Sequence, residues 1–290
     1  MLVIAFLGIG KMGRPMAYNL ASAGFRVKCW NRTSEKLGSL PSIMEAHEDL
    51  QMTISGADVV ISMLSDGSAT KKVISKLEND VLSSVKTWIE MASVLPQEAI
   101  DQSAFFQKKN VTYLDAPVSG GTIAADKGNL AIMVGGEKDV YQEAIKLFEP
   151  LGKSVLVGPC GAGQLAKLAN QAIVGITIGA VAEAVLLLER GGVNVDSVRQ
   201  ALSGGFADSV ILQQHGKRMS ERNFEAGGSI ATQLKDMQNI QNTAQMLGVE
   251  LPMVNKVTDR YLALSDDPSN LEKDHSALFL ELLKRNSLID

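Results

Sequence analysis

The segment Leu2-Val3-Ile4-Ala5-Phe6-Leu7-Gly8-Ile9-Gly10-Lys11-Met12-Gly13-Arg14 decides the fold, because an apolar run leads through a glycine-rich turn into a helical pattern. The spacing G-x-G-x-x-G in that context is typical of a dinucleotide-binding turn. Its glycines permit a tight turn, a close approach of backbone to a pyrophosphate, and packing of helix on strand. The start of the helix also directs N–H groups toward phosphates. The alternative is an ordinary strand–turn–helix. The residues predicted to bind the cofactor here are Gly8, Ile9, Gly10, Lys11, Met12 and Gly13.

The next apolar run, at 25–30, ends in Asn31-Arg32-Thr33, which contains no carboxylate. Sites specific for NAD usually carry an Asp or Glu about 20 residues after the glycines, where it accepts hydrogen bonds from the ribose. Arg32 could instead bind a 2′-phosphate through charge-assisted hydrogen bonds, with Asn31 and Thr33 as neutral donors. We therefore predict NADP(H) as the cofactor. The alternative is that Arg32 is a solvated turn residue.

Strand-like runs alternate with helical patterns as far as residue 157, which is typical of a Rossmann-type, doubly wound α/β sheet. Beyond residue 163 every segment has a helical pattern. We predict a dinucleotide-binding domain at 1–161 and an all-helical substrate and oligomerisation domain at 162–290. The expected strands are 2–7, 25–30, 57–64, 87–92, 111–115, 130–134 and 154–157. The expected helices are 14–24, 71–82, 96–109, 140–151, 164–191, 196–203, 210–221, 231–247, 252–264 and 275–284, with a short helix and loop in 33–50.

The composition argues against several classes of protein. The 290 residues are 46% hydrophobic and carry a net charge of −4, so nucleic acid is not an expected partner. Cys29 and Cys160 lie in no metal-type spacing, which favours reduced thiols in the cytoplasm. The apolar N-terminus lacks a basic leader, and we predict a strand there rather than a signal peptide. His47, His215 and His275 show no metal-ligand spacing, so we predict structural histidines and no metal.

The segment 172–188 is nearly all apolar and is close to the length of a membrane span. Thr177 and Glu183 interrupt it, and no other segment suggests a membrane. We therefore predict a long helix that is buried on most sides, between domains or between subunits, and a protein that associates with copies of itself.

Polar side chains lie near the start of this long helix. Lys167, Asn170 and Gln171 share one helix face, because they are three and four residues apart. A lysine ammonium aimed at a carbonyl oxygen can act as a general acid. The alternative is a solvated lysine at a helix start.

Two further stretches are candidates for binding. Ser119-Gly120-Gly121 follows a strand end, where exposed N–H groups could hold a carboxylate or phosphate. The alternative there is a plain glycine turn. Lys235-Asp236 lies within a predicted helix, where a surface pair of opposite charges is the default interpretation.

Taken together, four motifs resemble those of the β-hydroxyacid dehydrogenase family, which includes 3-hydroxyisobutyrate dehydrogenases and reductases of tartronate semialdehyde, glyoxylate and succinic semialdehyde. The resemblance runs in order from Met1 to about Leu283. Arg222-Asn223-Phe224 and Asp274-His275-Ser276-Ala277-Leu278 make the C-terminal half most similar to the tartronate semialdehyde reductases. The four motifs are 6–20, Asp115-Ala116-Pro117-Val118-Ser119-Gly120-Gly121, 161–171 and Lys235-Asp236.

The resemblance implies roles for individual residues. Lys167 would be the catalytic acid or base, and Asn170 would position the substrate. Lys235 would reach the nicotinamide end of the cofactor. The substrate carboxylate would bind to Ser119, Gly120 and Gly121, and the cofactor cleft would be lined by Leu64, Ser65 and Ser93. The resemblance also implies a homodimer or homotetramer.

We therefore expect an NADP(H)-dependent reductase that converts a small aldehyde acid to the hydroxy acid. Tartronate semialdehyde, glyoxylate and succinic semialdehyde are the candidate substrates. Departures from the usual family pattern, at Ser65-Asp66-Gly67, Ala92 and Gln171, leave the choice among them open. The alternatives are an NAD-dependent 3-hydroxyisobutyrate dehydrogenase, an imine reductase, and a catalytically silent NADP-binding sensor or interaction protein.

Overall fold

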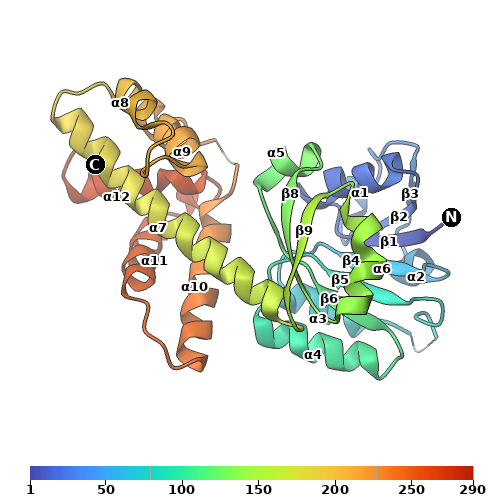
Figure 1. The fold of residues 1–290 in the computed structure, drawn as a ribbon. Helices are drawn as coiled ribbons and strands as arrows, with labels where there is room; N and C mark the ends of the chain where they lie inside the picture. Colours follow the sequence, from blue (N-terminus) through green and yellow to red (C-terminus); the bar gives the residue numbers. More distant parts are fainter. Residues whose placement is uncertain (79, 226, 290) are drawn as a thin grey trace. The chain divides into compact units, whose positions relative to one another are not determined.

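A nine-stranded sheet forms the centre of the first of two units in the computed structural model (Figure 1), which describes residues 1–78, 80–225 and 227–289. The units are Met1–Lys167 and Leu168–Asp290. The strand order is β3-β2-β1-β4-β5-β6-β8-β7, and β9 pairs with β8. The strands are β1 (Val3–Leu7), β2 (Arg26–Trp30), β3 (Met44–Ala46), β4 (Val59–Ser62), β5 (Thr87–Glu90), β6 (Thr112–Asp115), β7 (Val118–Ser119), β8 (Leu130–Gly135) and β9 (Gly152–Gly158).

The first six strands run parallel, and the order reverses at β1, so the predicted doubly wound sheet is confirmed. β8 is antiparallel to β6 and β7 but parallel to β9. Leu7 lies opposite both Trp30 and Ser62, and Glu90 lies opposite both Ser62 and Asp115. The carboxyl ends of these strands therefore form one edge, which is where α/β sheets of this type bind ligands.

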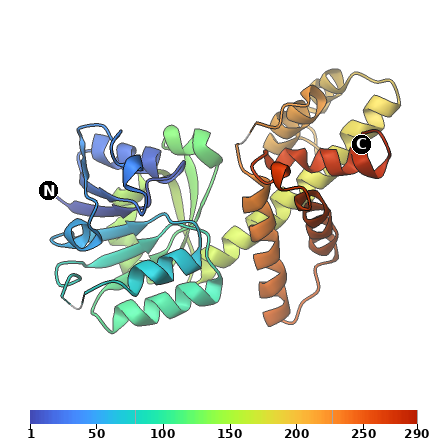
Figure 2. The same cartoon turned by 180° about the vertical axis from the view of Figure 1, so that it is seen from behind.

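Helices cover both faces of the sheet because successive strand residues point to opposite sides. Ile4 and Phe6 pack in one core with residues of α1, α5 and α6, whereas Ala5 and Leu7 pack in the other with residues of α2, α3 and α4. The first face is toward the viewer in Figure 1, and α3 and α4 lie in front of the sheet in Figure 2. The helices are α1 (Gly13–Ser22), α2 (Leu50–Ile54), α3 (Gly67–Ile74), α4 (Pro96–Gln107), α5 (Gly121–Asp126) and α6 (Lys138–Phe148), with a 3-10 turn at Ser34–Lys36.

The second unit is helical, as predicted. Ile178, Met237, Tyr261 and Phe279 are fully buried in its core. In the part of this unit that is described, the β-type pairing is one isolated bridge, between Ser229 and Asp274. Its elements are α7 (Ala162–Arg190, which begins in the first unit), α8 (Val195–Leu202), α9 (Val210–Glu221), α10 (Ile230–Met246), α11 (Pro252–Ser265) and α12 (Leu278–Arg285), with 3-10 turns at Pro268–Asn270 and His275–Ala277.

Among the described residues, α7 is the one helix that is long and apolar enough to cross a membrane. One third of its most apolar window is buried. The predicted burial on most sides is therefore not seen in this window.

Several short elements differ from the prediction. α3 begins at Gly67 because Asp66 accepts a hydrogen bond from Ala69 N–H (2.8 Å), and it ends at Ile74, so the predicted bounds 71–82 were wrong at both ends. β3, β7, α2 and α5 were not predicted as separate elements. Each is at most six residues long, which is too short to establish a periodic pattern.

Candidate active site

The glycine turn between β1 and α1 is shaped by close backbone contacts. A Cβ on Gly8 (φ +106°) would overlap the Met63 carbonyl, and one on Gly13 would overlap the Gly8 carbonyl. A Cβ on Gly10 would meet no atom within 4 Å. The first and third glycines are thus needed for packing, whereas the second borders open space, as a phosphate-binding turn requires.

The residues after β2 lie beside this turn. The side-chain oxygen of Asn31 accepts a hydrogen bond from Ile9 N–H (3.0 Å), and its amide donates to the Thr33 carbonyl (2.9 Å). Asn31 therefore ties the two loops together and commits an amide hydrogen that was predicted as a phosphate donor. Arg32 and Thr33 are exposed, so the guanidinium can reach a ligand at this edge.

The other predicted cofactor residues follow the neighbouring strands. Leu64 comes after β4, and its side chain packs against Gly8. Ser65 is exposed and Ser93 is half-buried, and they follow β4 and β5. Lys11 is exposed and Met12 half-buried within the turn itself. The parallel strands therefore bring these residues to the carboxyl edge of the sheet.

Lys167 is buried, with 8% of its surface exposed, and lies early in α7. The start of this helix is held by Asp115 at the end of β6, whose carboxylate accepts hydrogen bonds from Gly161 N–H and Gln164 N–H (2.8 Å each). The Gln164 side chain accepts from Val94 N–H (3.0 Å) and donates to the Ala92 carbonyl (2.9 Å). These bonds place the first turns of α7 in the first unit. The units consequently divide inside α7, after Lys167, whereas the predicted boundary was at its first residue.

Asp115 and Glu90 are acids that the structure buries beside this anchor. Burial raises the pKa of Asp115 to about 6, against the lowering effect of its hydrogen bonds from Gly161 and Gln164. Burial also raises the pKa of Glu90 to about 7, and a hydrogen bond from Ala92 N–H offsets only part of that. The edge of the sheet thus carries two carboxyl groups that hold their protons unusually well.

The predicted carboxylate loop starts a short helix. Ser119 ends β7, Gly120 precedes α5 with φ +132°, and Gly121 is the first residue of α5. A Cβ on Gly120 would overlap the Ala124 side chain. The glycines therefore allow the chain to turn directly into α5, where the first N–H groups of a helix lack partners within it.

The predicted residues of the second unit form a hydrogen-bonded network. The Asn170 amide donates to the Gln171 side-chain oxygen (2.9 Å), and the Gln171 amide donates to the Asp236 carboxylate (2.7 Å). Lys235 Nζ lies 3.5 Å from the other oxygen of Asp236, which is 2% exposed. The adjacent pair Lys235–Asp236 is therefore not a simple surface pair, because α10 buries its acid and the acid anchors Gln171.

Comparison with known proteins identifies the family of the chain. Residues 3–159 match the model described as the NAD binding domain of 6-phosphogluconate dehydrogenase, and residues 161–282 match that described as NAD-binding of NADP-dependent 3-hydroxyisobutyrate dehydrogenase. The 2-hydroxy-3-oxopropionate reductase of Escherichia coli is 37% identical over 98% of this chain and 99% of its own length.

The chain belongs to the β-hydroxyacid dehydrogenase family. An NAD-dependent L-serine dehydrogenase of Pseudomonas aeruginosa is 30% identical over 90% of this dehydrogenase and 91% of that protein. The structure of Mycobacterium tuberculosis 3-hydroxyisobutyrate dehydrogenase with L-serine is 28% identical, covers 97% of this chain and 99% of that one, and has a TM-score of 0.87. This dehydrogenase is therefore an oxidoreductase of the type that acts on the CH–OH group of hydroxy acids with a pyridine nucleotide.

The sequence did not single out the residues that support this dehydrogenase's site. Asp115 and Gln164 anchor the helix that carries Lys167, and Gln233 donates to the Gln171 carbonyl (3.4 Å). Asp115 stood in a recognised motif, and its place at a strand end could have identified it. The roles of Gln164 and Gln233 depend on contacts with distant segments, which a sequence pattern does not report.

The structure brings two of the predicted structural histidines together. His215 and His275 are 60 residues apart in sequence, yet their Nε2 atoms lie 3.2 Å apart, and Asp274 lies beside them. No pattern along the chain groups them, because the contact joins α9 to the 3-10 turn before α12. Burial opposes ionisation of Asp274, but hydrogen bonds from His215 and Ser276 and the charge of His275 outweigh it and lower the pKa of this carboxyl.

Proposed function

We propose that the enzyme reduces a small aldehyde acid to the corresponding hydroxy acid with NADPH, the substrate being tartronate semialdehyde, glyoxylate or succinic semialdehyde. The four motifs in order support this reaction. The chain resembles the E. coli 2-hydroxy-3-oxopropionate reductase over nearly the whole of both chains, and this makes tartronate semialdehyde the first candidate substrate.

Lys167 carries the chemical argument. When bound, the cofactor supplies a hydride, and reduction of an aldehyde to an alcohol also requires one proton on the carbonyl oxygen. The Lys167 ammonium, buried in the anchored start of α7, is the proposed donor of that proton. A fixed positive charge stabilises the negative charge that develops on the oxygen more than it stabilises the neutral carbonyl.

Arg32 supports NADPH over NADH. It follows β2 in an exposed loop beside the glycine turn, where a guanidinium can pair with a 2′-phosphate and where the chain has no carboxylate to repel one. The space around Gly10 would admit the pyrophosphate.

The substrate and the nicotinamide have further candidate partners. Ser119, Gly120 and Gly121 would supply hydroxyl and N–H donors at the start of α5. Asn170 would orient the substrate, and its amide is itself oriented by Gln171. Lys235 would lie near the nicotinamide. We also propose that the protein is a cytoplasmic homo-oligomer that binds neither nucleic acid nor membrane.

The test is a panel assay with the purified chain. Each aldehyde acid is supplied with NADPH or NADH, and loss of reduced nucleotide is followed by absorbance. We expect turnover with NADPH and at least one of the three aldehyde acids. Oxidation of 3-hydroxyisobutyrate with NAD⁺ and no reduction of the panel would favour the alternative 3-hydroxyisobutyrate dehydrogenase. Nucleotide binding without turnover of any compound would indicate a silent NADP-binding protein.

A further inference from the structure

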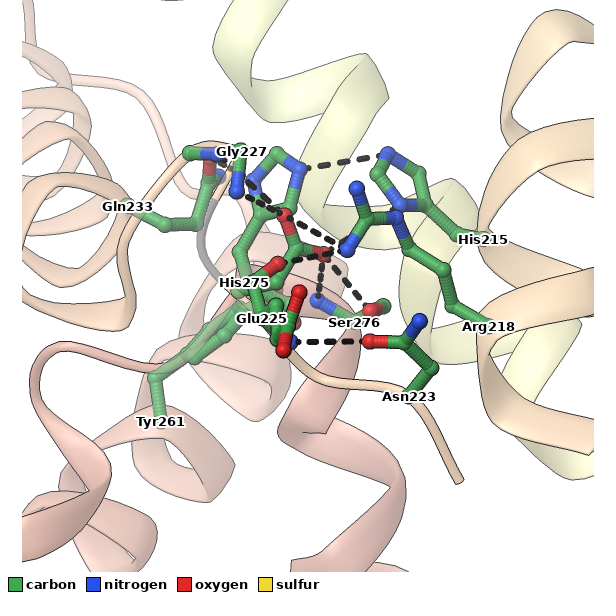
Figure 3. Close-up of polar contacts among 11 residues, drawn as sticks. His215, Arg218, Asn223, Glu225, Gly227, Gln233, Tyr261, His275 and Ser276 are labelled. Carbon is green, nitrogen blue, oxygen red and sulfur yellow. Dashed lines mark hydrogen bonds and ion pairs between the residues drawn. The ribbon is translucent and has the colours of Figure 1, made fainter. Parts of the chain in front are cut away.

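Two imidazoles face each other within the second unit, away from any role proposed above (Figure 3). His215 is on α9, and His275 begins the 3-10 turn before α12. Their Nε2 atoms are 3.2 Å apart, and the ring planes are at 86° with centres 4.6 Å apart. The rings therefore meet through their nitrogens rather than by stacking.

In each ring Nε2 is the inner nitrogen, which faces the other histidine, and Nδ1 is the outer nitrogen. The outer nitrogen of His215 faces the Asp274 carboxylate, which accepts hydrogen bonds from several donors. Asp274 accepts hydrogen bonds from the N–H groups of Gly227 (3.0 Å) and Gly228 (3.2 Å) and from both N–H (3.1 Å) and hydroxyl (2.6 Å) of Ser276. His215 Nδ1 lies 3.4 Å from Asp274 Oδ1. This contact is electrostatic and lacks hydrogen-bond geometry, but an ionised carboxylate at this distance favours the form of His215 that carries a hydrogen on Nδ1.

The outer nitrogen of His275 faces an amide whose orientation is set by its neighbours. Gln171 Nε2 donates to Asp236 and also lies 3.3 Å from Gln233 Oε1, while Gln233 Nε2 donates to the Gln171 carbonyl. If the Gln233 amide were flipped, its NH₂ group would face the NH₂ group of Gln171, and its oxygen would face the Gln171 backbone carbonyl. Its oxygen therefore faces His275 Nδ1 (3.3 Å), which must also carry a hydrogen.

The inner nitrogens are left with lone pairs that face each other. A neutral imidazole with its hydrogen on Nδ1 has an unprotonated Nε2. Two such nitrogens at 3.2 Å repel each other unless a shared proton or a metal cation lies between them. Zn²⁺ binds imidazole nitrogen at about 2.0–2.1 Å, and a tetrahedral angle then separates two ligand nitrogens by about 3.3 Å.

We propose that His215 and His275 bind one Zn²⁺-type ion through their Nε2 atoms, with Asp274 and Gln233 holding the outer nitrogens. Hydrogen bonds from ligand histidines to carboxylate and carbonyl oxygens are the usual outer support of metal sites. Imidazole ligands favour zinc, copper, nickel or cobalt over magnesium or calcium. Water completes the coordination. Arg218, whose guanidinium lies 3.9 Å from Asp274, adds positive charge nearby and limits the affinity.

The test is calorimetric titration of the full chain, without an affinity tag, with zinc chloride. We expect one Zn²⁺ per chain and at least tenfold weaker binding by His215→Asn and His275→Asn. Gln233→Leu, which removes an outer partner, should weaken binding about tenfold. His47→Asn is the matched control, because His47 lies in the first unit beside Glu45 and should leave the affinity unchanged.

Failure of the wild-type chain to bind zinc, or equal binding by all three histidine variants, would overturn the proposal. NMR of the wild type provides a measurement that does not depend on folding of the variants. Zinc should shift the imidazole signals of two histidines and leave the third in place. Signals of a proton shared by His215 and His275 that zinc does not displace would also overturn it. None of these outcomes depends on the proposed reductase activity.

Discussion

At the scale of single residues, Lys167 is a cation whose removal should separate chemistry from cofactor binding. Replacing it with Met keeps most of the side-chain volume but removes the proton donor. We expect kcat to fall by about 10²–10⁴-fold while NADPH affinity, measured by fluorescence titration, stays within a factor of a few. Lys153→Met, at an exposed position in β9, is the control. Turnover near the wild-type level would contradict a catalytic Lys167.

Arg32 should act on the choice of nucleotide. Charge-assisted hydrogen bonds contribute roughly 1.5–3 kcal/mol, so Arg32→Ser should raise KM for NADPH about tenfold or more. KM for NADH should change little, because NADH lacks the 2′-phosphate. Steady-state kinetics with both nucleotides measures the two effects in one protein. Equal changes in the two KM values would assign Arg32 a structural role instead.

The raised pKa of Glu90 predicts that the stability of the fold depends on pH. Its pKa is about 7 in the folded protein, against 4.5 for an ordinary glutamate, because burial disfavours the ionised form. Between those pH values the unfolded chain loses this proton while the folded chain keeps it, so stability falls as pH rises, by about 3 kcal/mol. We expect Glu90→Gln to match the wild type near pH 4 and exceed it near pH 8, in urea unfolding. The same pH dependence in both proteins would contradict the raised pKa.

At the scale of elements, two glycines in the turn from β1 to α1 have different roles: Gly13 is needed for packing, and Gly10 for ligand binding. Gly13→Ala places a methyl group against the Gly8 carbonyl, so α1 must move away from β1. We expect the free energy of unfolding to fall by about 2–3 kcal/mol. Thermal or urea unfolding followed by circular dichroism measures the loss.

Gly10→Ala is the matched variant, because its added methyl group meets open space. We expect its stability to stay within about 0.5 kcal/mol of the wild type. The Kd for NADPH should nevertheless rise at least about tenfold, since the methyl group would occupy the path of the pyrophosphate. Unchanged NADPH affinity in a folded Gly10→Ala variant would place the cofactor elsewhere.

At the scale of the whole molecule, α7 presents apolar side chains that this chain leaves uncovered. Ile173 and Leu187 are 66% and 74% exposed. Ile176, Gly179 and Met253 line a hollow of about 210 Å³ between α7, α11 and α12, with charged side chains also at its border: Glu183, Lys256, Arg260 and Arg285. Exposed apolar patches of this kind mark surfaces for association. We propose that a second copy of the chain covers this face.

Leu187→Glu should therefore shift the protein from an oligomer toward a monomer in light scattering coupled to gel filtration. A charge buried in an interface without a partner is costly, so the shift should be large. Met52→Glu, at a 62% exposed position on α2, is the control and should leave the mass unchanged. A monomeric wild type would contradict the proposal.

What the sequence determined by itself was local. The glycine turn, the alternation of strands and helices, and a long helix expected from residue 164 follow from spacings within a few residues. They sufficed to predict the doubly wound sheet and the helical unit after it. Arg32 and Lys167 were singled out as candidates in the same way. β7 and α5 were missed because a few residues carry too little periodicity to identify an element.

Only the tertiary structure decided which distant residues meet. It set Asp115 against the first turn of α7, enclosed Asp236 beside Gln171, and joined His215 to His275 across 60 residues. Such contacts depend on how whole elements pack, and the identity of neighbouring residues in the chain does not specify them. For the same reason burial, which raises the pKa of Glu90 and Asp115, could be known only once the strands were stacked side by side.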